Sequence, residues 1–206
     1  MFLRLPLAAA LSCLVGCGTT APEPVAAENV LISADRRDQQ VLEAVLLRIL
    51  ADPDIHLTRA SAADGTLVLY DQYLTRSGVL RPEAMRNYLG EGHAIPSELA
   101  ASIWFRNERA GSNNPSFAAF AHLEFDSRIV LGTEAESGLG LGSFTDTFPL
   151  ARAWLRAWLP GYSSDAKYAV VRASVGPAPH GALVTAYLRE SNGEWRVEWH
   201  HMAWFF

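Results

Sequence analysis

Apolar residues recur at helical spacing in three stretches of the chain. Between Arg36 and Ala51 they fall at positions i, i+3 and i+4, and Asp52-Pro53 ends the pattern. Pro82 to Leu89 and Pro96 to Arg109 each begin with a proline, which suits the first turn of a helix because no N–H is needed there. The pattern predicts helices over residues 36–51, 82–89 and 96–109.

Strand character follows a different periodicity. Gly65 to Leu74 is rich in β-branched and aromatic residues, and apolar and polar residues alternate between Phe120 and Leu131 on both sides of Asp126. Near the C-terminus three more stretches have strand character: Lys167–Val175, Ala182–Glu190 and Glu194–Phe205. The sequence therefore predicts an α+β domain, with N-terminal helices followed by a C-terminal antiparallel sheet packed on helices.

The segment between these groups suggests a loop and a fourth helix. Ser137 to Gly142 (SGLGLG) is predicted to be a flexible loop, because it lacks the lysine and the directly following helix of a phosphate-binding loop. Thr147 is suited to cap a helix with Pro149 near its start and Pro160-Gly161 at its end. One face of that helix would be apolar and the other would carry two arginines: Leu150, Ala151, Trp154, Leu155 and Trp158 on the first, and Arg152 and Arg156 on the second.

Asn192-Gly193 is the strongest turn signal in the chain, because a two-residue type I′ turn needs positive φ at both positions. With this turn, Leu188 lies opposite Val197, and Val184 lies opposite His201. One face of the hairpin then becomes almost wholly apolar: Val184, Ala186, Leu188, Trp195, Val197, Trp199 and His201. We expect this face to be buried against the helix of Trp154 and Trp158.

The N-terminus has the pattern of an export signal. One positive charge, Arg4, precedes an apolar run of about 11 residues, Leu5 to Val15, which is too short to span a bilayer. The run ends in Leu14-Val15-Gly16-Cys17, which resembles the lipobox of bacterial lipoprotein signals. The resemblance implies transfer of diacylglycerol to the sulfur of Cys17, cleavage after Gly16 and acylation of the new amino group. The alternatives are an ordinary secretory signal and, less favoured, a cytosolic N-terminus that is merely apolar.

The residues after the cysteine indicate a tether and a location. Gly18 to about Asn29 is rich in Pro, Ala, Thr and Glu without periodicity, which is typical of a flexible linker. The predicted organisation is a signal peptide over 1–16, the lipidated cysteine and tether over 17–30, and one domain over 31–206. The residue after the cysteine is Gly18, and Asp at this position is associated with lipoproteins that stay on the inner membrane. In a cell with two membranes, Gly18 therefore favours a location on the outer membrane, facing the periplasm.

Composition excludes some functions. The 206 residues are half hydrophobic, which is enough for a core, and the net charge of −5 without a basic stripe argues against nucleic-acid binding. The two cysteines, Cys13 and Cys17, both precede the domain. The predicted domain therefore has no internal disulfide and no cysteine-based metal site.

The C-terminal half, from about residue 100, resembles a loose group of uncharacterised bacterial proteins, many of them exported. The matching features are Phe105-Arg106-Asn107, Trp154–Tyr162 (WLRAWLPGY), Ser163–Val170, the loop Val175–Gly181 and Asn192–Val197. The chain departs from the group at Pro177–His180, where no cysteine stands. The resemblance implies a fold and carries over no activity.

A few polar residues are candidates for chemistry. His122, Glu124 and Asp126 alternate with apolar residues, so on a strand their side chains would share one face and could bind a divalent metal. We favour the simpler interpretation that these three residues lie on the solvent-exposed face of a half-buried strand. His180 lies in a Pro-rich loop, where a functional role is possible, but we favour a solvated histidine.

No catalytic motif stands out, so the sequence favours a binding or structural domain without cofactor or metal, held to the membrane through Cys17. Its partner would be a protein, a glycan or a small molecule, and not a nucleic acid. The alternative is a hydrolase or metal-dependent enzyme that uses groups such as His122, Glu124, Asp126 and His180.

Overall fold

A computed structural model of the chain describes residues 34–52, 65–70, 81–87, 94–112, 120–133, 136, 141–176 and 181–204. The chain divides into two units, Met1–Val30 and Leu31–Phe206, and all described residues belong to the second. The predicted signal peptide, Cys17 and the tether lie outside the described residues. Among the helices that are described, none is both long enough and apolar enough to cross a membrane.

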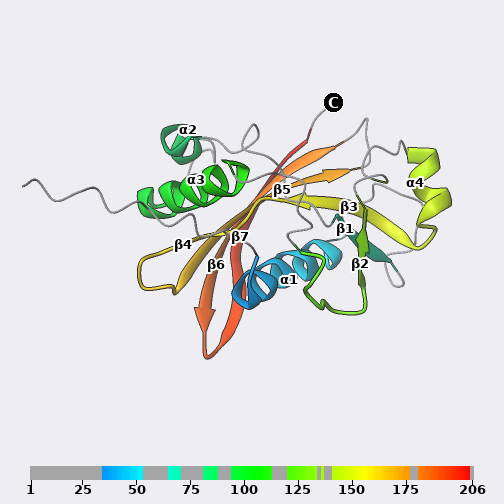
Figure 1. Cartoon of the computed structure of the whole chain (residues 1–206), viewed down its shortest axis with the longest axis horizontal. Coiled ribbons are helices and arrows are strands. Elements are labelled where there is room, and N and C mark those ends of the chain that lie inside the picture. Colours follow the sequence, from blue (N-terminus) through cyan, green and yellow to red (C-terminus); the bar gives the residue numbers. More distant parts are fainter. Residues whose placement is uncertain are drawn as a thin grey trace, which may run out of the picture. The chain divides into compact units, whose positions relative to one another are not determined.

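The described residues form helices and strands that are mixed in the first part of the chain, and only strands follow α4 (Figure 1). In chain order they are α1 (Arg36–Leu50), β1 (Thr66–Tyr70), α2 (Pro82–Asn87), α3 (Ser97–Ser112), β2 (Ile129–Gly132), α4 (Leu141–Thr147), β3 (Ala151–Ala157), β4 (Gly161–Tyr162), β5 (Tyr168–Gly176), β6 (Ala182–Ser191) and β7 (Glu194–Trp204). The helix predicted over 36–51 is confirmed, and helices also form within 82–89 and across 96–109.

The seven described strands form one mixed sheet in the order β2-β1-β3-β5-β6-β7, with β4 paired to β5. Strands β2, β1 and β3 run parallel, whereas β3, β5, β6 and β7 pair antiparallel. The predicted α+β class is therefore confirmed, but two details are wrong. The sheet is not wholly antiparallel, and β1 and β2 lie between helices in the chain, so the helices do not all precede the sheet.

Helix α1 covers one face of the sheet. Asp35 caps it, and Asp35 and Asp38 each accept a hydrogen bond from the other's backbone N–H, which forms a capping box. Its apolar residues form a buried stripe: Val41, Leu42, Val45, Leu46, Ile49 and Leu50. This stripe packs against alternate residues of the sheet, such as Val171 on β5 and Leu188 on β6. The helical spacing in the sequence therefore identified the buried face correctly.

The opposite face of the sheet is covered at two places. Helices α2 and α3 pack over β4 to β7, where Met85, Leu99 and Ile103 meet Val170 and Tyr187. Helix α4 packs over β1 and β3 in a separate apolar cluster. Figure 1 shows α1 on the lower side of the sheet, α2 and α3 above its left half, and α4 at the right end.

The predicted helix after Thr147 is wrong, because residues 151–157 form strand β3. Thr147 ends α4 instead of capping a helix. In this segment (ARAWLRA) apolar residues satisfy both helical spacing and simple alternation, and pairing with β1 and β5 decides for the strand. Trp154 and Arg156 therefore share one face of β3, and Leu155 points to the other.

The hairpin of β6 and β7 follows the prediction near the turn and departs from it further away. Asn192 and Gly193 have φ values of 56° and 83°, and Leu188 pairs with Val197 as expected. The register then shifts between Tyr187 and Leu188, so that Tyr187 pairs with Trp199. A β-bulge of this kind inserts one extra residue on β7 and reverses the faces of all that follow.

Two predicted members of the apolar hairpin face are consequently misplaced. Trp195 and Val197 pack on the α1 side, but Trp199 packs with the α3 cluster. His201 lies opposite Thr185 rather than Val184, so it also leaves the predicted face. Met202 takes the place on the α1 side that the prediction assigned to His201.

Smaller differences concern the middle of the chain. Strand structure is confined to Ile129–Gly132 within the stretch predicted from 120 to 131, and residues 123–126 are irregular. Helix α4 begins at Leu141, inside the predicted loop 137–142, whose first four residues lie outside the described ones. Residues 71–74 and the loop with His180 also lie outside the described residues.

Candidate functional site

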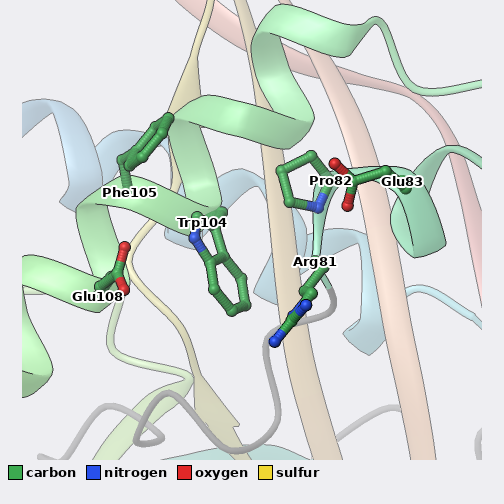
Figure 2. A pocket seen from close by; sticks show the side chains of 6 residues that line it. All are labelled: Arg81, Pro82, Glu83, Trp104, Phe105 and Glu108. Carbon is green, nitrogen blue, oxygen red and sulfur yellow. The ribbon is translucent and has the colours of Figure 1, made fainter.

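An open groove lies between the start of α2 and the outer side of α3 (Figure 2). Its volume is about 370 Å³, within the range of roughly 300–1,000 Å³ that is usual for ligand pockets. The lining residues are Arg81, Pro82, Glu83, Trp104, Phe105 and Glu108. The groove is thus formed by two short stretches that lie more than twenty positions apart in the chain.

Helix α3 presents its groove residues because of its amphipathic spacing. Leu99 and Ile103 are fully buried against the sheet, and Asn107 lies one turn further on the same side. Trp104 directly follows the buried Ile103, and Glu108 directly follows the buried Asn107. Both side chains are only half-buried, while Phe105 is 57% exposed. The helix therefore places an aromatic pair at its surface, next to α2.

The groove combines aromatic surface with charge of both signs. Figure 2 shows the Trp104 indole between the Glu108 carboxylate on one side and Arg81 and Pro82 on the other. Trp, Phe and Arg offer large contact areas and directional donors, and such residues supply much of the binding energy of interfaces. The six lining residues include no histidine, cysteine or serine, so the arrangement is suited to binding and offers no evident nucleophile.

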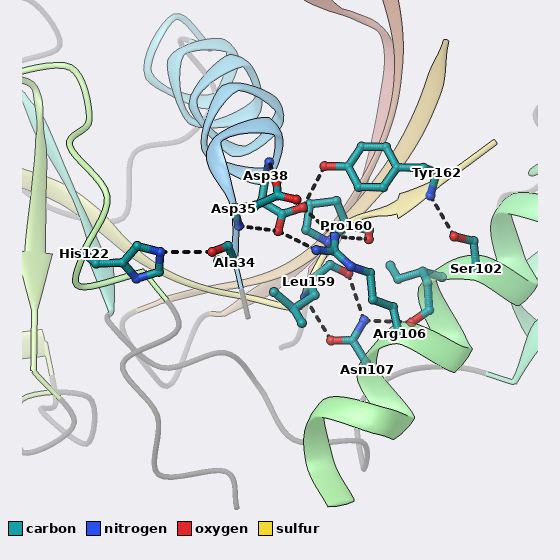
Figure 3. Close-up of polar contacts among 11 residues, drawn as sticks. Ala34, Asp35, Asp38, Ser102, Arg106, Asn107, His122, Leu159, Pro160 and Tyr162 are labelled. Carbon is teal, nitrogen blue, oxygen red and sulfur yellow. Dashed lines mark hydrogen bonds and ion pairs between the residues drawn. The ribbon is translucent and has the colours of Figure 1, made fainter. Parts of the chain in front are cut away.

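The groove rests on a buried polar junction that fixes α3 to the sheet (Figure 3). Asp38 on α1 is fully buried and forms an ion pair with Arg106 on α3, in which both guanidinium Nη atoms donate to its two oxygens, Nη2 at 2.6 Å. The Tyr162 hydroxyl donates to the same carboxylate at 2.7 Å, and the backbone N–H of Asp35 donates at 2.9 Å. Arg106 also donates to the carbonyl of Pro160.

In this junction Asp38 and Arg106 are both charged, and the hydrogen-bonding atoms of Asp38 are all engaged by neighbouring groups. Burial opposes the charge on Arg106, but the hydrogen bonds and the attraction of Asp38 outweigh it and raise the pKa of Arg106 above its ordinary value. Burial, together with the neighbouring Asp38 carboxylate, raises the pKa of the Tyr162 hydroxyl far above its ordinary value. Tyr162 therefore remains a proton donor to Asp38, and both oxygens of Asp38 are already engaged. We interpret the group as a structural element.

Asn107 continues the junction one residue further along α3. Its amide donates to the carbonyls of Ile103 and Leu159 at 2.7 and 2.8 Å, and its carbonyl accepts from the Leu159 N–H at 2.9 Å. Gly161 lies so close to α3 that a Cβ atom there would collide with the backbone nitrogen of Ile103. The segments Phe105-Arg106-Asn107 and Trp154–Tyr162, which stood out in the sequence, are therefore in direct contact.

A smaller, mostly apolar groove lies at the other end of the sheet. Its volume is about 200 Å³, and it is lined by Thr66, Val130, Thr147, Phe148, Pro149, Leu150 and Ala151. Leu150 is 62% exposed there, similar to Phe105. Isolated exposed apolar residues are common on protein surfaces. Leu150 is therefore a suitable reference when Phe105 is tested.

The structure does not place His122, Glu124 and Asp126 on one strand face, because residues 122–126 form a turn and an irregular stretch. The His122 ring bonds to the carbonyl of Ala34 at 3.0 Å. Asp126 pairs with Arg128 at 2.9 Å, and these hydrogen bonds lower the pKa of Asp126 to about 2. Among the described residues no three His, Cys, Asp or Glu side chains come together as metal ligands would.

The remaining predicted site residues are Cys17 and His180, and both lie outside the described part of the chain. Neither a scan against models of protein families nor searches of curated proteins and of solved structures returned a match to this chain. A function for the chain therefore rests on its residues and their geometry alone.

Sequence reasoning missed most of the groove and the junction. The Asp35-x-x-Asp38 spacing before an apolar run is a capping signal that could have marked the start of α1. Nothing in the sequence pairs Asp38 with Arg106, which lies 68 positions away. The contact between α2 and α3 likewise depends on the packing of both helices on the sheet.

Proposed function

We propose that this protein is a lipid-anchored binding protein of the cell envelope, and that the groove between α2 and α3 contacts a partner protein. The observation that carries the proposal is the exposed Phe105 beside Trp104, on a helix that a buried ion pair and a buried asparagine hold in place. A preorganised surface loses less conformational entropy on binding than a mobile one.

The groove also has the composition of a protein contact. Its centre is aromatic, and charged residues of both signs, Arg81, Glu83 and Glu108, surround the centre. Interfaces are typically arranged in this way, with an aromatic or arginine-rich centre and a polar rim. No contact among the described residues favours a hydrolase or a metal-dependent enzyme, so we propose neither.

The proposed anchor rests on the N-terminal sequence. The apolar run and Leu14-Val15-Gly16-Cys17 support lipidation of Cys17, and several acyl chains hold a protein on a membrane far better than one chain. Gly18 supports placement on the outer membrane, facing the periplasm, in a cell with two membranes. The acidic net charge of −5 gives little attraction to anionic lipid, so the lipid would supply the membrane affinity.

Replacement of the anchor residue tests this part of the proposal. We expect Cys17→Ser to abolish incorporation of a fatty-acid analogue during metabolic labelling and to leave an uncleaved or misplaced protein. Cys13→Ser, which removes the other cysteine, is the matched control and should incorporate label like the wild type. Equal labelling of wild type and Cys17→Ser would refute the lipid anchor.

The groove is tested by purification from the native envelope. We expect Phe105→Ser to lose at least about nine-tenths of a co-purifying partner, since a central aromatic anchor is commonly worth about 2 kcal/mol or more. Leu150→Ser removes a similarly exposed apolar side chain at the other end of the sheet and should retain the partner. Equal loss in both variants, or in neither, would count against the groove.

A further inference from the structure

The first turn of α1 carries two exposed arginines, Arg36 and Arg37. Positive charge is unfavourable at this end of a helix, because the free backbone N–H groups there already carry partial positive charge. Arg36 makes no hydrogen bond or ion pair to another described residue. Nearby, the Asp35 carboxylate accepts the N–H of Asp38, and the Asp38 carboxylate pairs with Arg106. The two arginines therefore give this corner of the domain a local excess of positive charge.

Two amphipathic rings lie beside these arginines. The guanidinium of Arg37 lies 5.4 Å from the centre of the Tyr162 ring, and the Tyr162 and Trp195 rings lie 6.0 Å apart between their centroids. Figure 3 shows Tyr162 next to the start of α1, where its hydroxyl donates to Asp38. Both rings are half-buried against the core, so part of each ring is at the surface. We call this group of Arg36, Arg37, Tyr162 and Trp195 the corner surface.

The corner surface follows directly after the segment that leads from the proposed anchor. The first described residue is Ala34, two positions before Arg36. A chain spans at most about 3.3–3.6 Å per residue, so residues 17–33 keep Ala34 within about 60 Å of the Cys17 lipid. A short linker also gives an attached group an effective concentration in the millimolar range, so even a weak contact with the bilayer would be populated.

We propose that the corner surface rests on the phospholipid surface of the membrane that holds the chain. The two arginines lie against headgroup phosphates, and the two rings lie at the level of the headgroups. Planar guanidinium groups match phosphate, and Trp and Tyr are enriched at membrane–water interfaces. The chain has a net charge of −5, but salt screens charges beyond about 10 Å, so the local charge decides. This inference rests on the proposed lipid anchor and gives the anchored domain a preferred orientation.

The inference is tested with the full lipidated chain, purified from its native membrane and reconstituted in phosphatidylcholine vesicles with or without phosphatidylglycerol. Part of the lipid carries bromine near the headgroup, which quenches nearby tryptophan fluorescence, and the share of Trp195 is the difference between wild type and Trp195→Phe. We expect quenching of Trp195, and stronger quenching with the anionic phosphatidylglycerol. Chains that float with the vesicles without this quenching would overturn the inference and leave the anchor standing. A chain that does not float would refute both.

Arginine variants supply the matched comparison. A basic residue near an anionic membrane contributes about fivefold in affinity, so Arg36→Gln combined with Arg37→Gln should lower the ratio of docked to undocked domains by about tenfold or more. Arg48→Gln removes an exposed arginine from the last turn of the same helix and should leave the quenching unchanged. Equal quenching in wild type and the double variant, or in vesicles with and without phosphatidylglycerol, would show that the proposal is wrong.

Discussion

The substitution Arg106→Met is expected to lower the free energy of unfolding by about 3–5 kcal/mol, because it leaves the carboxylate of Asp38 buried without its cation. Tyr162 and the N–H of Asp35 would still donate to that carboxylate, but neither carries a charge. Chemical denaturation, followed by tryptophan fluorescence, measures the loss. The expected magnitude is a large part of the stability of an ordinary domain.

A double-mutant cycle separates the ion pair from general loss of packing. Asp38→Leu combined with Arg106→Met removes both charges, so the double variant should lose less stability than the sum of the two single variants. Arg128→Met breaks the exposed pair with Asp126 and should change stability little. Strict additivity in the cycle would show that Asp38 and Arg106 do not stabilise each other.

The second large effect is expected for Asn107→Leu, which keeps the approximate volume of a fully buried side chain and removes its amide. The N–H and the carbonyl of Leu159 would then both lose a partner, at a cost of about 1–3 kcal/mol for each buried group. The expected loss of unfolding free energy is therefore about 2–6 kcal/mol. Denaturation curves of the purified variant measure it.

Ser102→Ala provides the graded comparison for Asn107→Leu. It removes one acceptor from the same junction, the hydroxyl that binds the Tyr162 N–H at 2.8 Å. Only one backbone group loses a partner, so the loss should be clearly smaller than in Asn107→Leu. A loss as large in Ser102→Ala as in Asn107→Leu would show that the Leu159 contacts do not dominate the stability of the junction.

Elements with one dominant local signal were predictable from the sequence. The stripe on α1 follows from helical spacing, and the turn of the β6–β7 hairpin follows from Asn192-Gly193, whose φ values are both positive. The bulge near Glu198 was not predictable, because a bulge adds one residue without a local composition signal, and that residue moves Trp199 and His201 to the other face.

The error at β3 has a different cause. The residues of this segment favour helix by intrinsic propensity, since Ala, Leu and Arg dominate it. Its pairing with β1 and β5 overrides that preference, and long-range pairing is not visible in a single sequence. Arg156 was predicted on the solvent-exposed face of a helix, but in the structure it lies half-buried on one face of the sheet.

The candidate groove was only partly accessible from the sequence. The predicted helix over 96–109 includes Trp104, Phe105 and Glu108, and the resemblance drew attention to Phe105, but nothing in the sequence indicated that these side chains line a groove. Their exposure depends on which side of α3 meets the sheet, and that side carries the buried Leu99 and Ile103 as well as the contacts of Asn107. Arg81 and Glu83 join them only through the packing of α2 on α3.

The most direct test of the proposed partner contact is photocross-linking in intact cells, with benzoylphenylalanine placed at position 105 or, as reference, at position 150. We predict that position 105 yields a discrete adduct with a partner protein, that position 150 does not, and that Trp104→Ala in the same chain diminishes the adduct. An equal pattern of adducts at both positions, or a lipid or glycan adduct alone at position 105, would contradict the proposal that the groove between α2 and α3 binds a protein.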